Sequence, residues 1–193
     1  MSVRGLNTTL GLSHETISQR FGSKRELYFA ALDHGFADYF VVAAEERSTF
    51  PPDLDDLDEL RATIAVFVRA AGRRPELGQV INHESFQPGE RLDYIFERAL
   101  EPGMRAVAEL VGRLADRGVI EPTSARELFF LGQAGAAPFA LSALSVAFNR
   151  IDGPFDSELH VQRFTDFVVR GLKHEPTEPA KSARVAATRK RSR

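Results

Sequence analysis

Residues 12–33 read LSHETISQRFGSKRELYFAALD, and they predict a short helix followed at once by a long one. Ser13 favours a helix N-terminus, because its hydroxyl can accept the free amide protons of the first turn. The run 14–20 that follows spans only about two turns. A helix this short does not hold together alone in water. Ile17 is expected to point inward among mostly polar neighbours, and Ser23 to cap the next helix, so the short helix should be docked with its polar face available for binding.

The pattern GLSxxTIxxxFGSKxxL, from residue 11 to residue 27, carries a family resemblance. It resembles the DNA-binding signature of tetracycline-repressor-like (TetR-type) transcriptional regulators, whose second motif helix enters the major groove. The resemblance covers about the first forty residues, and the rest of the chain resembles the family in its length and all-helical pattern. It implies a helix-turn-helix head, residues 1–46, on a helical body, residues 47–174, that binds a ligand and forms a homodimer.

The short helix supplies the predicted contacts with double-stranded DNA. Gln19 and His14 are expected to reach base edges, since glutamine can pair bidentately with adenine. Members of the family commonly have an aromatic residue at the positions of Ser18 and Gln19, so base preference does not carry over. Arg20 and Lys24 are expected to bind phosphate, Lys24 from the first turn of its helix. The full predicted set is Ser13, His14, Glu15, Thr16, Ser18, Gln19, Arg20 and Lys24.

Residues 1–10 predict the first helix of the motif, with Leu6 and Leu10 on one apolar face. Family members normally have another amphipathic helix before it, and this chain begins too late to include one. One explanation is a start assigned downstream of the true one, which fits the intact remainder of the motif. The other is a head that lacks part of its DNA-binding core. Either way, Leu6, Leu10, Ile17 and Phe29 are expected to expose apolar surface.

Charge is distributed unevenly along the 193 residues. Residues 1–34 carry four basic and three acidic side chains, and residues 175–193 carry six and two, which leaves −7 for the segment between them. A less acidic N-terminal end suits a protein that meets phosphates there. The tail 175–193 is expected to be disordered, and either to add sequence-independent DNA affinity or to have no specific role. Because cysteine is absent and no signal peptide is recognisable, a cytoplasmic protein is expected.

Apolar residues recur at three- and four-residue spacing through the body, which predicts an all-α fold. Asp55, Asp56 and Asp58 fall in the first turn of one helix, where its dipole favours negative charge, and a metal site there is the weaker interpretation. Thr123 is expected to cap a later helix, and Pro102 to kink a long one. The expected helices span 25–50, 53–74, 76–86, 90–117, 126–148 and 156–173.

The segment 128–148 contains no charged residue. A membrane span is one interpretation, because about 20 apolar residues suffice. Polar residues within the segment and ordinary amphipathic neighbours favour a helix buried all round instead. Its many small residues would let another backbone approach closely, which suits a two-fold dimer interface formed together with 156–173.

The body has aromatic side chains on faces that are expected to point inward, drawn from fifteen phenylalanines and no tryptophan. These rings either fill a core or, as the resemblance implies, line a cavity for a mainly apolar effector. A lone histidine such as His83 is more often a core or boundary residue than a ligand contact. The predicted ligand-binding residues are Phe67, His83, Phe86, Phe96, Phe130 and Gln133.

No catalytic motif is found: there is no nucleophile elbow, phosphate-binding glycine loop or HExxH sequence. We therefore expect no enzyme, cofactor or metal. The leading hypothesis is a ligand-responsive transcriptional repressor that a small apolar effector releases from its operator. The alternative is a helical ligand-binding or interaction protein that has lost DNA binding through truncation of its head.

Overall fold

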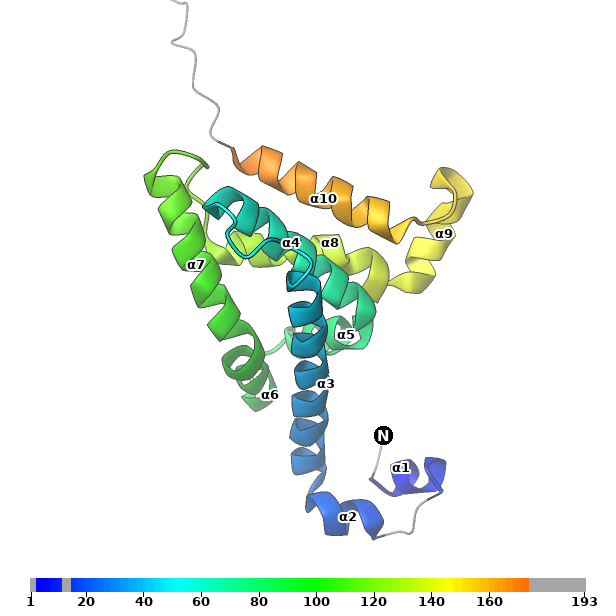
Figure 1. Cartoon of the computed structure of the whole chain (residues 1–193). Helices are drawn as coiled ribbons and strands as arrows, with labels where there is room; N and C mark the ends of the chain where they lie inside the picture. The colour runs from blue at the N-terminus through cyan, green and yellow to red at the C-terminus, as the bar shows by residue number, and fades with distance from the viewer. Residues whose placement is uncertain (1–2, 12–14, 174–193) are drawn as a thin grey trace, which may run out of the picture.

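The structure is a computed structural model that describes residues 3–11 and 15–173, and within them the chain is all α, as predicted. No strand occurs in these ranges, and an isolated antiparallel bridge joins Ile120 to Lys173. The elements, shown in Figure 1, are α1 (Val3–Thr9), α2 (Thr16–Phe21), α3 (Lys24–Arg47), α4 (Asp56–Arg73), α5 (Pro75–Glu84), α6 (Glu90–Ile95), the π-helical turn η1 (Phe96–Leu100), α7 (Glu101–Asp116), α8 (Ala125–Ala140), α9 (Ser142–Asp152) and α10 (Ser157–Leu172).

The helices α1 and α2 lie at the end of α3 that points away from the body (Figure 1). Gly22 has a φ of 76°, a conformation that favours glycine, and it turns the chain from α2 into α3. The predicted Ser23 cap is confirmed: its hydroxyl accepts from the backbone N–H of Glu26, whose carboxylate accepts from the Ser23 N–H. Ser13, the other predicted cap, lies outside the described residues.

Apolar exposure in the head is smaller than the sequence suggested. Ile17 is only 5% exposed, so the expectation that it would stay uncovered is wrong. Leu6 and Phe29 are half-buried, whereas Leu10 is 58% exposed. The two short helices therefore bury part of their apolar surface against one another and against α3.

The body is built around α4, which packs against α3, α7, α8 and α10. Its N-cap is Asp55, whose carboxylate accepts from the N–H groups of Leu57 and Asp58. Asp56 accepts from Arg113 at 3.0 Å and from Arg117 at 2.5 Å, both on or just after α7, and these bonds lower the pKa of its carboxyl. The acidic cluster thus has capping and ion-pairing roles.

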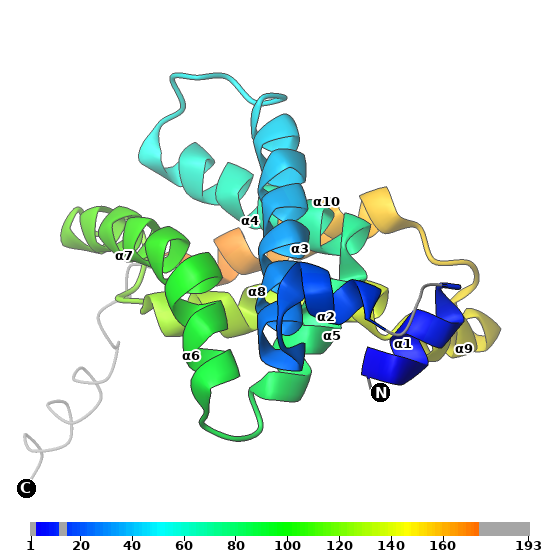
Figure 2. The ribbon, with the colours of Figure 1, turned by 90° about the horizontal axis from the view of Figure 1, so that it is seen from below.

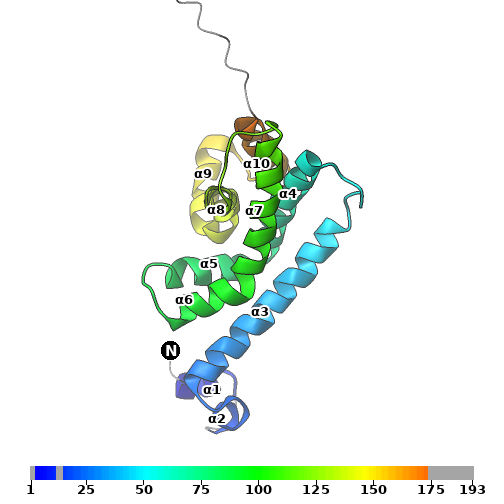
Figure 3. The same cartoon turned by 90° about the vertical axis from the view of Figure 1, so that its left-hand side faces the viewer.

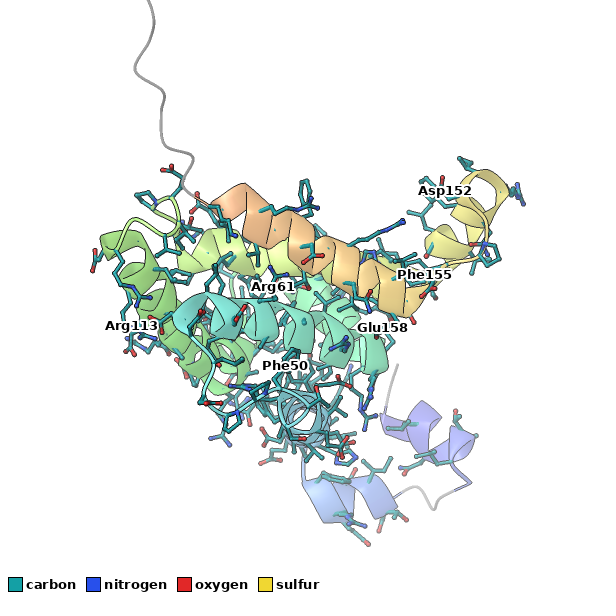
Figure 4. All side chains as sticks on the ribbon, turned by 45° about the horizontal axis from the view of Figure 1, so that its top comes forward. Phe50, Arg61, Arg113, Asp152, Phe155 and Glu158 are labelled. Carbon is teal, nitrogen blue, oxygen red and sulfur yellow. The ribbon has the colours of Figure 1, made fainter. Side chains whose placement is uncertain are left out.

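Ion pairs also join α4 to α10, which runs alongside it (Figure 4). Arg61 pairs with Asp166, and Arg69 with Glu158. Arg69 also approaches the buried Glu46, at the end of α3, to 3.8 Å. The end of α3 is therefore held against the same seam of the body.

The expected helix 90–117 is divided by a π turn. α6 ends at Ile95, η1 occupies Phe96–Leu100, and α7 begins at Glu101. A proline ring clashes with the carbonyl four residues earlier, which for Pro102 belongs to Arg98 within η1. The wider π turn accommodates Pro102 and takes the place of a simple kink.

The expected helix 126–148 is also broken, so the interpretation of one helix buried all round is wrong. α8 ends at Ala140, two residues after Pro138, which interrupts the helical hydrogen bonds, and α9 leaves at 81°. No residue of α9 is buried. Among the described residues no single helix is long and apolar enough to cross a bilayer, although bent α8 and α9 together pass on length and composition.

The small residues of α8 have a role inside the protomer. A Cβ at Gly132 would lie 2.9 Å from the Phe67 ring of α4, and one at Gly135 would lie 2.4 Å from the Phe164 ring of α10. These glycines therefore let large rings approach the α8 backbone. The predicted cap of this helix is wrong by one residue, since Ser124 and not Thr123 forms the capping box with Glu127.

Candidate functional site

Helix α2 is amphipathic, with one buried apolar face and one exposed polar face. Ile17 faces inward, and the polar residues Glu15, Ser18, Gln19 and Arg20 are exposed, as is Lys24 at the start of α3. Thr16 is half-buried. Of the predicted DNA contacts, Ser13 and His14 lie outside the described residues. The remaining six lie within ten residues of one another, at the end of α3 farthest from the body.

Local contacts constrain how this surface could meet DNA. The Gln19 amide donates to the Glu15 carboxylate at 3.1 Å. The Arg20 guanidinium lies 5.7 Å from the centroid of the Phe21 ring. A base contact by Gln19 would use the amide that Glu15 now holds, so Glu15 either orients that amide or has to release it.

A cavity of about 400 Å³ lies where α3, α4, α5, η1, α7 and α8 meet. Figures 2 and 3 show α3 running along one side of the body, next to α4 and α6. Aromatic rings from three helices line it: Phe36 and Phe40 from α3, Phe67 from α4 and Phe129 from α8. Its volume falls within the range of about 300–1,000 Å³ that is typical of small-molecule sites.

Two of the six predicted ligand-binding residues, Phe67 and Gln133, line this cavity. For the other four, the expectation that they line a shared cavity is wrong. Phe130 is 65% exposed, and its neighbour Phe129 lines the cavity instead. Adjacent residues on a helix diverge by about 100°, and α8 is apolar on several faces, so periodicity could not fix which ring points inward.

The remaining three residues lie on the surface near α6. Phe86 is 85% exposed and Phe96 is 48% exposed. His83 and Phe86 border a separate surface depression around the loop 87–89. Helix α5 ends at Glu84, so Phe86 lies in the connection to α6 and not on a packed helix face.

The sequence did not point to the contribution of α3 to the cavity. Phe36, Tyr39 and Phe40 line it from a helix that was assigned largely to the head. The second apolar stripe of α3 could have indicated this contribution. The stripe continues beyond the first turns of the helix, and only those turns are needed to pack against the head.

Charged groups at the cavity wall are already paired. The Arg47 guanidinium donates to Glu59 at 2.6 Å, and that of Arg74 donates to Asp38 at 2.6 Å. The phenol of Tyr39 is uncharged, because burial raises its pKa to about 12. The cavity therefore offers neutral polar groups and apolar surface.

Helix α3 also contacts α6, which leads through η1 to the cavity wall. Tyr94 of α6 donates to Asp33 at 2.7 Å, and the Arg91 guanidinium of α6 lies 4.3 Å from the centroid of the Tyr28 ring. The Tyr28 hydroxyl donates to Glu84, at the end of α5, at 2.9 Å. The rings of Phe29 and Tyr94 lie 4.3 Å apart. Within η1 and α7, Ala99, Leu100 and Gly103 line the cavity, so α6 connects that wall to the head-proximal half of α3.

An open groove lies on another side of the body, between α8, α9 and the start of α10. Its volume is about 750 Å³, and Asp152 and Phe155 mark its position at the turn into α10 (Figure 4). Leu144 and Phe148 of α9 line the groove and are exposed, and the exposed Ile151 on α9 and Phe167 on α10 lie outside its lining.

No known protein family matches this chain, and no curated protein matches it either. Within the described ranges, no group of three or more histidine or carboxylate side chains is placed to hold a metal ion.

Proposed function

We propose that this chain is a ligand-responsive DNA-binding transcriptional regulator, a repressor released from its operator by a small, mainly apolar molecule. The supporting observation is that one helix serves both parts. α3 follows directly after α2 and Gly22, and its middle supplies Phe36, Tyr39 and Phe40 to the cavity. A helix of 24 residues is about 36 Å long, so a small tilt in the cavity displaces α2 at its end.

A ligand shifts such an equilibrium only by its difference in affinity between the two arrangements. Coupling free energies of about 1–3 kcal/mol are typical, which corresponds to a change of about 5- to 150-fold in DNA affinity. Filling the cavity would push on α3 directly and, through η1, on α6. The contacts of Arg91 and Tyr94 on α6 with Tyr28 and Asp33 would pass the second movement to the same helix.

The proposal includes a homodimer, because two copies of α2 are needed to occupy successive major grooves, about 34–36 Å apart. Exposed apolar residues on α8, α9 and α10 support an interface there. The buried Gly132, Gly135 and Ala136 would lie behind it and would not form its surface. Such a protein would be cytoplasmic and would need no cofactor.

Selection of bound sequences from random double-stranded DNA tests the proposal. The chain should enrich one palindromic sequence, and Gln19→Ala should change the preferred base at a position in each half-site. Arg105→Ala is the matched control, since Arg105 is exposed on α7 and pairs only locally with Glu101. Failure of the wild-type chain to enrich any sequence would contradict the proposal.

That outcome would favour the second candidate, a helical ligand-binding protein without DNA binding. The observation that favours this candidate is Leu10, directly after α1, which exposes 58% of its surface where another apolar element could pack. A ligand that stabilised the chain without any effect on DNA would support it.

A further inference from the structure

The cavity combines a large apolar wall with very few polar atoms. Phe36, Phe40, Phe67, Phe129 and Met104 supply rings and a thioether, and none of these side chains can donate a hydrogen bond. Burial of apolar ligand surface against them is favourable by about 25 cal/mol per Å². The wall therefore binds the carbon skeleton of a ligand and contributes little to its orientation.

The two arginines of the wall do not offer a free positive charge. Arg47 is paired with Glu59, and Arg74 with both Asp38 at 2.6 Å and Glu76 at 3.7 Å. A carboxylate or phosphate in the cavity would have to displace one of these partners or remain without a counter-ion. Taking an unpaired charge out of water costs several kcal/mol, so the wall disfavours anions.

The wall also disfavours cations. Glu59 and Asp38, the partners of the two arginines, do not line the cavity, and no carboxylate lines it in the part of the chain that the structure describes. An ammonium group there would lose its hydration without gaining an ion pair.

Three neutral polar side chains line the cavity: Tyr39 from α3, Thr63 from α4 and Gln133 from α8. No hydrogen bond of these side chains is found within residues 3–11 and 15–173. Tyr39 also has its pKa raised to about 12, and burial is the cause. The Tyr39 phenol and the Gln133 amide line the cavity without a hydrogen bond to the described residues, so a bound molecule can satisfy them.

We infer that the cavity binds an uncharged, predominantly apolar small molecule that carries a hydrogen-bond acceptor, such as a ketone, ester or neutral amide, held by Tyr39 and Gln133. The inference rests on the proposed function, because it names the chemical class of the effector. It adds that ionised analogues of the same size are rejected.

Matched compounds test this directly on the full chain by isothermal titration and thermal shift. One set is decan-2-one, decane, decanoate and decylammonium, and a second set is 2-acetylnaphthalene, naphthalene and 2-naphthoate. We expect one or both ketones to bind at least tenfold more tightly than the ion of the same skeleton. Equal or tighter binding of an ion, or binding of no ketone, would overturn the inference.

Variants locate the polar contact. Tyr39→Phe and Gln133→Leu should each weaken ketone binding about 3- to 10-fold, as expected for loss of one hydrogen bond, and should leave binding of the parent hydrocarbon unchanged. Gln87→Leu, on the exposed loop before α6, is the matched control. Equal weakening of ketone and hydrocarbon would show damage to the cavity and would contradict the assigned contact.

DNA binding is measured separately, so failures of the two proposals are distinguishable. A chain that binds the ketones and enriches no DNA sequence would refute the regulator and leave the ligand class standing. A chain that binds a specific DNA sequence and only charged ligands would refute the ligand class and leave the regulator standing.

Discussion

Arg25, in the first turn of α3, donates a hydrogen bond from its Nε to the carboxylate of Glu90 at 3.0 Å. Glu90 is the first residue of α6. The pair joins the two helices close to the head, and each partner responds to it: the pKa of Arg25 is raised and that of Glu90 is lowered. Both side chains are exposed, so the pair contributes little to global stability. The pair is important because of its position: it joins α6, which leads to the cavity wall, to α3, which follows α2.

Glu90→Gln should therefore change ligand-induced release from DNA more than it changes the melting temperature. The ratio of DNA affinities with and without ligand is the quantity to measure, and Arg25→Gln and the double variant complete the cycle. Non-additive effects in the double variant are expected, since the residues act as a pair. Independent effects on that ratio would show that the pair does not connect the parts.

Gly135→Ala should destabilise the chain by about 1–3 kcal/mol, because the added methyl group would overlap the Phe164 ring in a packed interior. Gly112→Ala on α7, where a Cβ meets open space, is the control and should stabilise by about 0.5–1 kcal/mol. Urea unfolding gives both values. A neutral Gly135→Ala would mean that α8 and α10 separate more easily than their packing indicates.

Alkaline pH should destabilise the fold through Tyr39. Its pKa is raised from 10 to about 12 in the folded state, so the stabilising effect is complete below pH 10 and is lost as the pH rises towards 12. The loss is on the order of 2–3 kcal/mol at most. Tyr39→Phe should show a smaller decrease in unfolding free energy between pH 9.5 and 11.5. Identical decreases in both proteins would assign the effect to other groups.

Lys24→Ala should weaken binding to all DNA sequences alike and reduce the slope of log affinity against log salt by about one unit. The reason is that Lys24 is exposed in the first turn of α3, where backbone amides also favour anions. Fluorescence anisotropy across a salt series measures the slope. An altered sequence preference with an unchanged slope would contradict a phosphate contact.

Phe167→Glu on α10 and Phe130→Glu on α8 should convert a dimer to monomers, as measured by light scattering. Both rings are more than 60% exposed, so these changes avoid the core damage that a buried residue such as Ala136 would cause. Phe86→Glu, which replaces an exposed ring elsewhere, should leave the dimer intact. Persistence of the dimer in both variants would place the interface on another face.

The sequence predicted most helices of the body and the Ser23 cap, because amphipathic spacing and capping chemistry are local properties. It could not predict the rotation of α8, where Phe129 and Phe130 look alike until neighbouring helices surround them. It also predicted one helix over 126–148, whereas the chain breaks and turns by 81° just beyond Pro138. The cavity depends on six elements from distant parts of the chain, so only Phe67 and Gln133 could be placed in it.

The three tyrosines of this chain, Tyr28, Tyr39 and Tyr94, all lie on α3 or in contact with it, and tryptophan is absent. The intrinsic ultraviolet fluorescence of the protein therefore comes from these residues alone. Tyr39 reports on the cavity, whereas Tyr28 and Tyr94 report on the junction of α3 with α6. Single tyrosine-to-phenylalanine changes would separate their signals, so ligand entry and helix displacement could be timed independently in unlabelled protein.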